Sequence, residues 1–308
     1  MSLLWGMMAA VLLVGCDTSG SSEGDSDENS PPFTSASVTV ESDTLELPGT
    51  LFVPDTSALV PGVVIVHGSG PIGQDGPGTP PVYKEWATRM ARQGIAVLRY
   101  DKRTTQPAVR RGDPRAITVL DFVRDAVAAG ERLRSQSGVD ADRLVLVGHS
   151  QGGNVAPAAA TRLEGVMGVA SLAGPALAID SLLVAQLEAR GGSGTCTADR
   201  ARAQFDSLRA DLSVSDGLIC GAGTTFWRQW IRHSQNIDSV AAALEPPLFA
   251  QQGRADPKYP GETLRRTIDA WRRLAAADNT TLRTYDGVGH RFRSPGPIDD
   301  LIAWIQDR

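Results

Sequence analysis

The sequence predicts an α/β protein with a mostly parallel central sheet that is flanked by helices. Short apolar segments of strand character alternate with longer segments of helical spacing, which is the rhythm of βαβ units. Near the middle of the chain, the apolar run 144–147 leads directly into Gly-His-Ser-Gln-Gly at 148–152 and then into a helix-forming stretch. Between residues 175 and 245 the rhythm breaks and only helical patterns remain, which predicts a helical insertion after the sixth strand.

The N-terminus predicts an exported protein. Residues 2–14 form an apolar run that is short for a membrane span, and a small residue, Gly15, separates it from Cys16. This pattern resembles the bacterial lipobox, which implies that residues 1–16 are a lipoprotein signal peptide and that a lipid on Cys16 holds the protein at a membrane of the cell envelope. Residues 17–34 are rich in Ser, Gly, Asp and Glu and predict a flexible acidic tether. An uncleaved apolar anchor is the alternative.

The core is expected in two parts, 35–174 and 246–308. In the first part, alternating polarity predicts an antiparallel hairpin, and two all-apolar runs suit strands that are buried on both faces. The strands are expected at 36–40, 45–53, 63–66, 95–99, 144–147 and 166–172, and the helices at 83–93, 119–133 and 154–162. The second part is expected to hold strands at 246–251 and 282–285 and helices at 264–277 and 298–305.

The insertion at 175–245 is expected to form a helical cap over the active site. Its helical patterns lie at 179–190, 198–212 and 225–244, and no strand pattern interrupts them. The last of them carries Phe226, Trp227 and Trp230, which would line an acyl pocket or pack inside the cap. Extra helices that pack on the edge of the sheet are the alternative to a cap.

Ser150 is the candidate nucleophile. It stands at the centre of the Gly-x-Ser-x-Gly turn between a strand and a helix, where a sharp backbone turn lifts the hydroxyl clear of the sheet. Small residues are needed on both sides because strand and helix crowd together there. An ordinary serine in a glycine-rich turn is the alternative reading of the same pattern.

A serine nucleophile needs a base and a group that orients this base. In the strand–turn–helix arrangement, the acid and then the histidine follow the serine in chain order. Of the four histidines, only His290 lies in a loop after the last strand, so it is the candidate base. Asp256 is the only carboxylate in the loop after strand 246–251 and is the candidate acid. Asp286 is the alternative acid, although its Asp-Gly sequence is typical of a turn.

Backbone N–H groups are expected to bind the oxyanion. One belongs to Gln151, which follows the nucleophile, and the second is expected from Ser69, between two glycines in the loop after strand 63–66. Cys196 and Cys220 are expected to form a disulfide, because an oxidising compartment permits it, and two free thiols are the alternative. No HExxH motif or CxxC spacing is present, so neither a metal nor an organic cofactor is expected.

Composition limits the class of partner. The 308 residues are 42% hydrophobic and 21% charged, as in ordinary globular proteins, and the net charge of −5 argues against nucleic acid as a partner. After the N-terminal run, no apolar stretch reaches the ~18 residues of a membrane span.

Five motifs together resemble one bacterial family, the α/β-hydrolase fold esterases of the serine aminopeptidase-like, S33-type group. They are HGSGP at 67–71, LRYDKR at 98–103, GHSQGG at 148–153, GRAD at 253–256 and GVGH at 287–290. The resemblance implies a cap and a Ser150–His290–Asp256 triad that hydrolyses carboxylic esters. It also implies that Ser69 and Gln151 donate to the oxyanion.

The expected function is therefore acyl-enzyme hydrolysis of a small-molecule ester without a cofactor. Thioesters or amides are alternative substrates, because the same constellation serves every acyl transfer. The remaining alternative, from a different class, is a non-catalytic lipoprotein that uses the hydrolase fold to bind a ligand or another envelope protein.

Overall fold

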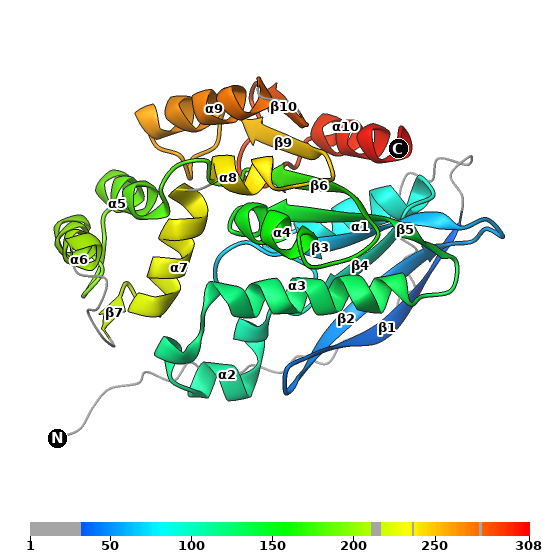
Figure 1. Ribbon diagram of the computed structural model, residues 1–308, viewed down its shortest axis with the longest axis horizontal. Coiled ribbons are helices and arrows are strands. Elements are labelled where there is room, and N and C mark those ends of the chain that lie inside the picture. The colour runs from blue at the N-terminus through cyan, green and yellow to red at the C-terminus, as the bar shows by residue number, and fades with distance from the viewer. Residues whose placement is uncertain (1–31, 211–216, 236, 277–278) are drawn as a thin grey trace, which may run out of the picture. The chain divides into compact units, whose positions relative to one another are not determined.

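The computed structural model describes residues 32–210, 217–235, 237–276 and 279–308. Eight strands form one sheet in the order β1-β2-β4-β3-β5-β6-β9-β10 (Figure 1). All pairings from β4 to β10 are parallel, whereas β2 runs antiparallel to both β1 and β4. The bounds are β1 Phe33–Ser42, β2 Leu45–Pro54, β3 Val60–Val66, β4 Ala96–Tyr100, β5 Val139–His149, β6 Val166–Leu172, β9 Leu248–Gly253 and β10 Thr280–Tyr285. The predicted mostly parallel sheet and its N-terminal hairpin are confirmed.

Burial explains why the apolar runs became central strands. All seven residues of β3 and all five of β4 are buried, because helices cover both faces of the sheet at its centre. In the edge strand β1, residues 34–37 are all exposed, and from Val38 to Ser42 exposed residues alternate with half-buried or buried ones, as expected where one face meets solvent. Strand β5 begins at Val139, five residues before the predicted apolar run, and Val139 pairs with Val60 of β3.

Helices flank the sheet as predicted. Helix α3 begins with a capping box in which Thr118 accepts from the backbone N–H of Asp121, and it packs against α4. Helix α1 packs against α10 and β4 (Figure 1). The bounds in this part of the chain are α1 Val82–Arg92, α2 Pro107–Arg111, α3 Val119–Arg134, α4 Gly152–Ala160, α9 Glu262–Ala275 and α10 Pro295–Gln306, with short 3-10 turns at Arg103–Thr105 and Pro114–Ala116.

The segment between β6 and β9 is helical, as predicted, but it differs from the prediction in two respects. A two-stranded ribbon, β7 and β8, lies within it, and such short strands leave no alternating pattern in the sequence. The single helix expected at 225–244 is divided into two. The bounds are α5 Ile179–Arg190, α6 Ala198–Ala210, β7 Leu218–Ile219, β8 Ala222–Gly223, α7 Thr224–Gln235 and α8 Ile237–Ala242.

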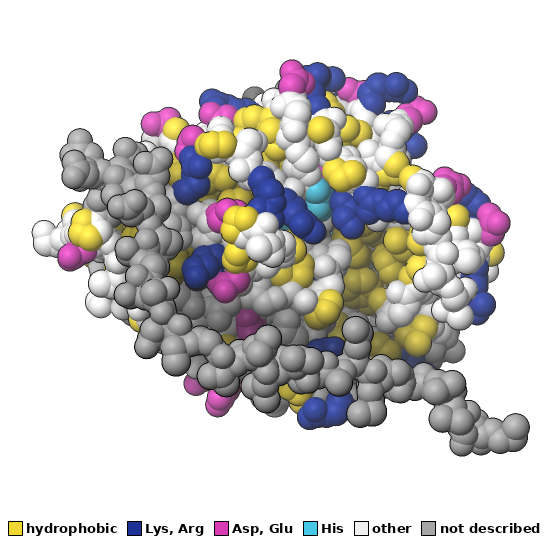
Figure 2. Space-filling model, turned by 180° about the vertical axis from the view of Figure 1, so that it is seen from behind, with side chains coloured by type: hydrophobic (Ala, Val, Ile, Leu, Met, Phe, Trp, Pro, Cys, Tyr) yellow, Lys and Arg dark blue, Asp and Glu magenta, His cyan; other side chains and the backbone are white. Residues whose placement is uncertain are grey.

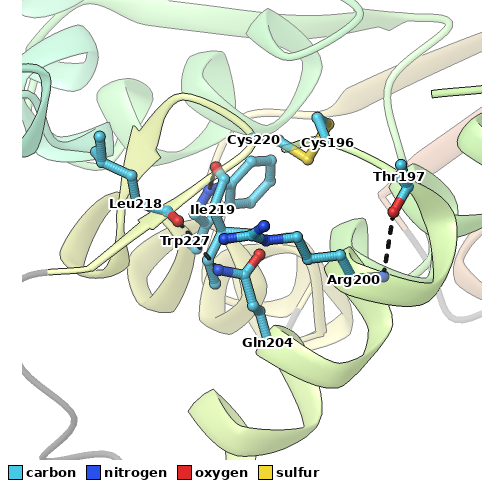
Figure 3. The surroundings of a disulfide bond; sticks show 8 residues. All are labelled: Cys196, Thr197, Arg200, Gln204, Leu218, Ile219, Cys220 and Trp227. Carbon is cyan, nitrogen blue, oxygen red and sulfur yellow. Dashed lines mark hydrogen bonds between the residues drawn. A yellow bond between two sulfur atoms is a disulfide. The ribbon is translucent and has the colours of Figure 1, made fainter. Parts of the chain in front are cut away.

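A disulfide joins Cys196, just before α6, to Cys220, in the turn between β7 and β8 (Figure 3). Hydrogen bonds tie the same ribbon to the neighbouring helices. The indole N–H of Trp227 donates to the carbonyl oxygen of Ile219 at 2.7 Å, and Gln204 Nε2 donates to that of Leu218 at 3.2 Å. The pair that the sequence singled out thus fastens the ribbon to the start of α6.

The sheet begins earlier than expected. The tether was expected to end at residue 34, but β1 begins at Phe33, whose ring packs on Phe52 with 4.9 Å between the ring centroids. An aromatic residue in this position buries apolar surface in the sheet, which the polar residues before it cannot do. Cys16, the signal peptide 1–16 and residues 17–31 of the tether lie outside the described residues. No helix within the described ranges is long and apolar enough to cross a membrane.

Candidate active site

Ser150 lies at the turn between β5 and α4 with a φ of 54°. This is the left-handed region, which residues other than glycine rarely adopt. Its backbone N–H donates to the carbonyl oxygen of Leu172 at 2.8 Å, which holds the turn against β6. A Cβ on Gly148 would lie 2.1 Å from the carbonyl oxygen of Gly152, and a Cβ on Gly152 would lie 2.2 Å from that of Val66. The two flanking glycines are therefore required by close backbone contact.

His290 and Asp256 come together from the loops after β10 and β9. The Nδ1–H of His290 donates to Oδ2 of Asp256 at 2.7 Å. The Asp256 side chain is fully buried, and it also accepts from Gln252 Nε2 at 3.2 Å and from the backbone N–H of Lys258 at 2.8 Å. Three donors hold this carboxylate in one orientation, which in turn fixes the imidazole ring and the tautomer with an unprotonated Nε2.

The structure does not bring the other candidate groups into this position. The Asp286 side chain is 90% exposed and lies 3.4 Å from Arg254, so the alternative acid is a surface residue. His67 is buried and donates to the carbonyl oxygen of Tyr100. His233 lies on α7, where burial lowers its pKa. In the described ranges, no three His, Cys, Asp or Glu side chains are grouped so that they could hold a metal ion.

Ser150, His290, Ser69 and Gln151 line one cavity of about 830 Å³. Within the described residues, the Ser150 hydroxyl has no hydrogen-bond partner, and the backbone N–H groups of Ser69 and Gln151 donate to no other residue. A Cβ on Gly68 would lie 3.3 Å from the Cβ of Ser150, so the loop after β3 runs directly beside the serine. Ser69 and Gln151, whose N–H groups are free among the described residues, thus line the same cavity as Ser150.

The helical insertion forms much of the cavity wall. Phe226, Trp227 and Trp230 of α7 all line it, and the two indole rings are stacked with 5.7 Å between their centroids. These aromatic residues are also buried, so they both line the pocket and pack inside the insertion. Trp230 Nε1 donates to Oδ1 of Asn154 at 3.1 Å, which connects the insertion to the helix that follows the nucleophile.

A buried hydrogen-bond chain links the loops that carry Ser69 and His290. The Tyr83 hydroxyl accepts from the backbone N–H of Gly68 at 3.0 Å and donates to Nδ1 of His149 at 2.9 Å. The Nε2–H of His149 then donates to the carbonyl oxygen of His290 at 2.8 Å. The neutral ring of His149, next to the nucleophile, thus hydrogen-bonds both sides of this chain and fixes the two loops relative to each other.

Lys102 makes a second buried connection. Its ammonium group lies over the Phe122 ring and donates to the carbonyl oxygen of Gly68 and to Oε1 of Gln151, both at 2.6 Å. It therefore ties together the two segments that hold the free N–H groups. Burial lowers the pKa of Lys102 to about 7, against a smaller opposing effect of Asp125.

The sequence did not assign roles to Tyr83, Lys102 and His149. Lys102 belongs to the LRYDKR motif and lies two residues after a buried strand. This position indicates a cation near the carboxyl end of the sheet. His149 stands directly before the candidate nucleophile in the sequence. Its ring nitrogens bond Tyr83 and a backbone carbonyl, and the second partner could not be foreseen because it lies 141 residues later.

We expect the protein to lose stability in mild acid because two buried histidines cannot be protonated without cost. Burial lowers the pKa of both His67 and His149 from 6.5 to about 3. Between these pH values the unfolded chain binds more protons than the folded one, so the free energy of unfolding falls as the pH falls. The slope is about 1.4 kcal/mol per pH unit for each histidine.

Urea unfolding at a series of pH values between about 7 and 5 measures this slope. In a His67→Gln variant, the free energy of unfolding should fall less steeply with pH, by about 1.4 kcal/mol per pH unit, which corresponds to one proton. Equal free energies of unfolding across this range would contradict the assignment of two neutral buried histidines.

Comparison with known proteins places the chain in a family. Residues 62–293 match the family described as serine aminopeptidase, S33. The chain belongs to this family.

Among curated relatives, Esterase EstD of Thermotoga maritima is 28% identical over 250 residues, which are 79% of this chain and 57% of EstD. The chain therefore spans little more than half the length of EstD. A monoacylglycerol lipase of Mycolicibacterium smegmatis is 28% identical over 246 residues, or 72% of this chain and 82% of the lipase.

Solved structures of esterases share the fold. An esterase from Pyrobaculum calidifontis superposes with a TM-score of 0.61 at 19% identity, covering 91% of this chain and 87% of that one. A bacterial brefeldin A esterase gives a TM-score of 0.58 at 21% identity, covering 93% and 80%. Together with the strand order, these similarities confirm the α/β-hydrolase fold.

Proposed function

We propose that this protein is a serine hydrolase that cleaves carboxylic esters through an acyl-enzyme intermediate. The observation that carries the proposal is the His290–Asp256 hydrogen bond at a cavity where, among the described residues, the Ser150 hydroxyl has no hydrogen-bond partner. The three residues follow one another in the chain as nucleophile, acid and base, from the three loops at the carboxyl ends of β5, β9 and β10. The names of the relatives, an esterase and a lipase, support esters as substrates.

In the proposed mechanism, Ser150 Oγ attacks the carbonyl carbon of the ester while its proton passes to Nε2 of His290. The carbonyl oxygen becomes an oxyanion that accepts from the N–H groups of Ser69 and Gln151. The bond to the alcohol then breaks, and His290 returns the proton to the leaving oxygen. A water molecule repeats the sequence on the acyl-enzyme and frees the carboxylic acid. Asp256 stays ionised and stabilises the imidazolium throughout.

Thioesters and amides remain alternative substrates of the same residues. Family membership itself points to peptide bonds as one candidate, since the family is described as serine aminopeptidases. Both groups would meet the same nucleophile and oxyanion donors, because all acyl transfers pass through a tetrahedral intermediate. The two relatives with names of ester-cleaving enzymes favour the oxygen ester over these alternatives.

We also propose that the protein is exported and held at a membrane by a lipid on Cys16. The lipobox-like sequence and the acidic stretch after it support the proposal. The disulfide between Cys196 and Cys220 is consistent with it, because such bonds persist in oxidising compartments outside the cytoplasm.

A fluorophosphonate probe and a series of p-nitrophenyl esters test the proposed activity. The wild-type protein should turn over the esters and take up one probe per chain, and peptide mapping should find the adduct on Ser150. An adduct on another residue would contradict the assigned nucleophile. A folded protein that takes up no probe and cleaves no ester, thioester or amide would favour the non-catalytic binding protein.

A further inference from the structure

The cavity beside Ser150 is lined by cations and by no acid. Lys102, Arg110, Lys258 and Arg291 all line it, whereas no Asp or Glu does so among the described residues. This bias is opposite to that of the whole chain, which has 35 acidic and 30 basic residues. On the face of the molecule that Figure 2 shows, Lys and Arg side chains lie on both sides of the visible histidine. The local charge at the cavity is therefore positive in an acidic protein.

About half of the arginines elsewhere in the described chain pair with a carboxylate, as the buried Arg103 does with Asp125 at 2.6 Å. Within the described residues, Arg110, Lys258 and Arg291 form no ion pair. Burial and the charge of Arg190 lower the pKa of Lys258, the carboxylate of Asp256 opposes this, and the charge of Arg291 lowers it further. Asp256 is hydrogen-bonded to His290, so the exposed cations, which form no ion pair among the described residues, are available to an anionic ligand.

The position of these cations relates them to the reaction. Arg291 directly follows His290, and Lys258 lies two residues after Asp256, with its own backbone N–H bonded to that carboxylate. Both side chains are exposed at the cavity, so they meet the substrate and solvent. The rest of the wall is largely apolar, with Ile179, Leu182 and Leu183 of α5 beside the aromatic residues of α7. An apolar chain with a charged end would complement this wall.

We propose that the substrate is an ester that carries an anionic group, such as a carboxylate, within a few bonds of the scissile carbonyl. Arg291 and Lys258 bind this group while Ser150 attacks the ester. This inference rests on the proposed ester hydrolysis and adds the charge of the substrate to it. Partly exposed cations favour a bound anion by about tenfold in kcat/KM, and salt screens the effect over a distance of about 8 Å.

Two pairs of esters of equal size separate charge from shape. The first pair is monomethyl glutarate and monomethyl glutaramate, in which a neutral amide replaces the carboxylate on the acyl side. The second pair is the acetate ester of γ-hydroxybutyrate and that of its amide, with the charge on the alcohol side. The released acid or alcohol gives kcat/KM for each ester on the intact protein. In at least one pair, the anionic member should be preferred by about tenfold, and the preference should fall as NaCl is raised.

Charge-removing variants locate the effect. Arg291→Gln and Lys258→Gln should each lower the ratio of anionic to neutral kcat/KM by about threefold. The ratio is the readout because both residues adjoin the triad and their replacement can also change both rates together. Arg266→Gln removes an exposed arginine of α9 that does not line the cavity, and it should leave both rates unchanged.

The proposed function and this inference fail in different ways. If the neutral esters are cleaved by a Ser150-dependent reaction but neither anionic ester is preferred, the substrate charge is wrong and the hydrolase stands. A preference that survives in both Gln variants would show that other residues carry it, which also overturns the inference. If no ester is cleaved, the proposed ester hydrolysis and the inference both fall.

Discussion

Asp256→Asn should fold like the wild-type protein and lose about 10⁴-fold in kcat for esters. The carboxylate accepts the Nδ1–H of His290 at 2.7 Å, and this bond keeps the other ring nitrogen free to take the serine proton. An asparagine amide at the same place donates to Nδ1 instead, so the proton moves to Nε2 and the ring can no longer act as a base. The loss therefore comes from the wrong tautomer rather than from lost packing.

The surroundings of Asp256 allow this exchange without unfolding. The backbone N–H of Lys258 donates to Oδ1, so the amide oxygen of an asparagine can keep that hydrogen bond. Gln252 Nε2 donates to Oδ2 and to the carbonyl oxygen of Gly253, and among the described residues its Oε1 has no partner. A flip of the side chain therefore lets Oε1 accept from the new amide at the cost of the bond to Gly253. We therefore expect the free energy of unfolding to change far less than the rate.

Kinetics with p-nitrophenyl esters, together with urea unfolding, check the prediction. Ser150→Ala sets the lower limit, because without the nucleophile only the residual effect of the binding site remains. Asp286→Asn is the matched control, since it makes the same chemical change on a side chain that is 90% exposed, and its rate should stay within about twofold of wild type. If Asp256→Asn kept more than about a tenth of the activity, another group would have to orient His290.

The sequence predicted those parts of the site that depend on local pattern and chain order. Ser150 could be assigned because the glycines at 148 and 152 mark the strand–turn–helix unit in the sequence. Backbone contact within that unit requires Gly148, and contact with Val66 of the neighbouring β3 requires Gly152. His290 and Asp256 could be assigned because each follows a strand of the sheet, and the carboxyl ends of parallel strands meet at one edge. The helical insertion was predicted from the break in strand rhythm.

The parts that the sequence did not predict depend on contacts between distant segments. The hydrogen-bond partners of Lys102 are Gly68, 34 residues earlier, and Gln151, 49 residues later. No local sequence pattern predicts contacts over such separations. The ribbon of β7 and β8 has two residues in each strand, too few for a polarity pattern to show. The cationic cavity wall likewise combines Arg110 of α2 with Lys258 and Arg291, which lie in the separate loops after β9 and β10.

Lys102→Met should lower kcat for esters by about 10²-fold and change KM much less. Methionine fills a similar volume over the Phe122 ring, but it leaves the carbonyl oxygen of Gly68 and Oε1 of Gln151 without their buried donor. The segments that carry the N–H groups of Ser69 and Gln151 are then free to shift. Removing one oxyanion donor outright costs about 10²- to 10³-fold, and the loss of a residue that positions two donors should reach the lower end of this range.

A transition-state analogue distinguishes this positioning role from a general loss of stability. A boronic acid that forms a tetrahedral adduct with Ser150 should bind the Lys102→Met variant more weakly by the same factor as kcat/KM falls. Val40→Ala serves as the control, because it removes buried volume from β1, away from the cavity, and costs about 1–3 kcal/mol. If both variants lose stability equally but only Lys102→Met loses kcat and analogue affinity, Lys102 positions the oxyanion donors. If Lys102→Met keeps wild-type kcat, the two N–H groups are held by their own loops and the role assigned to Lys102 is wrong.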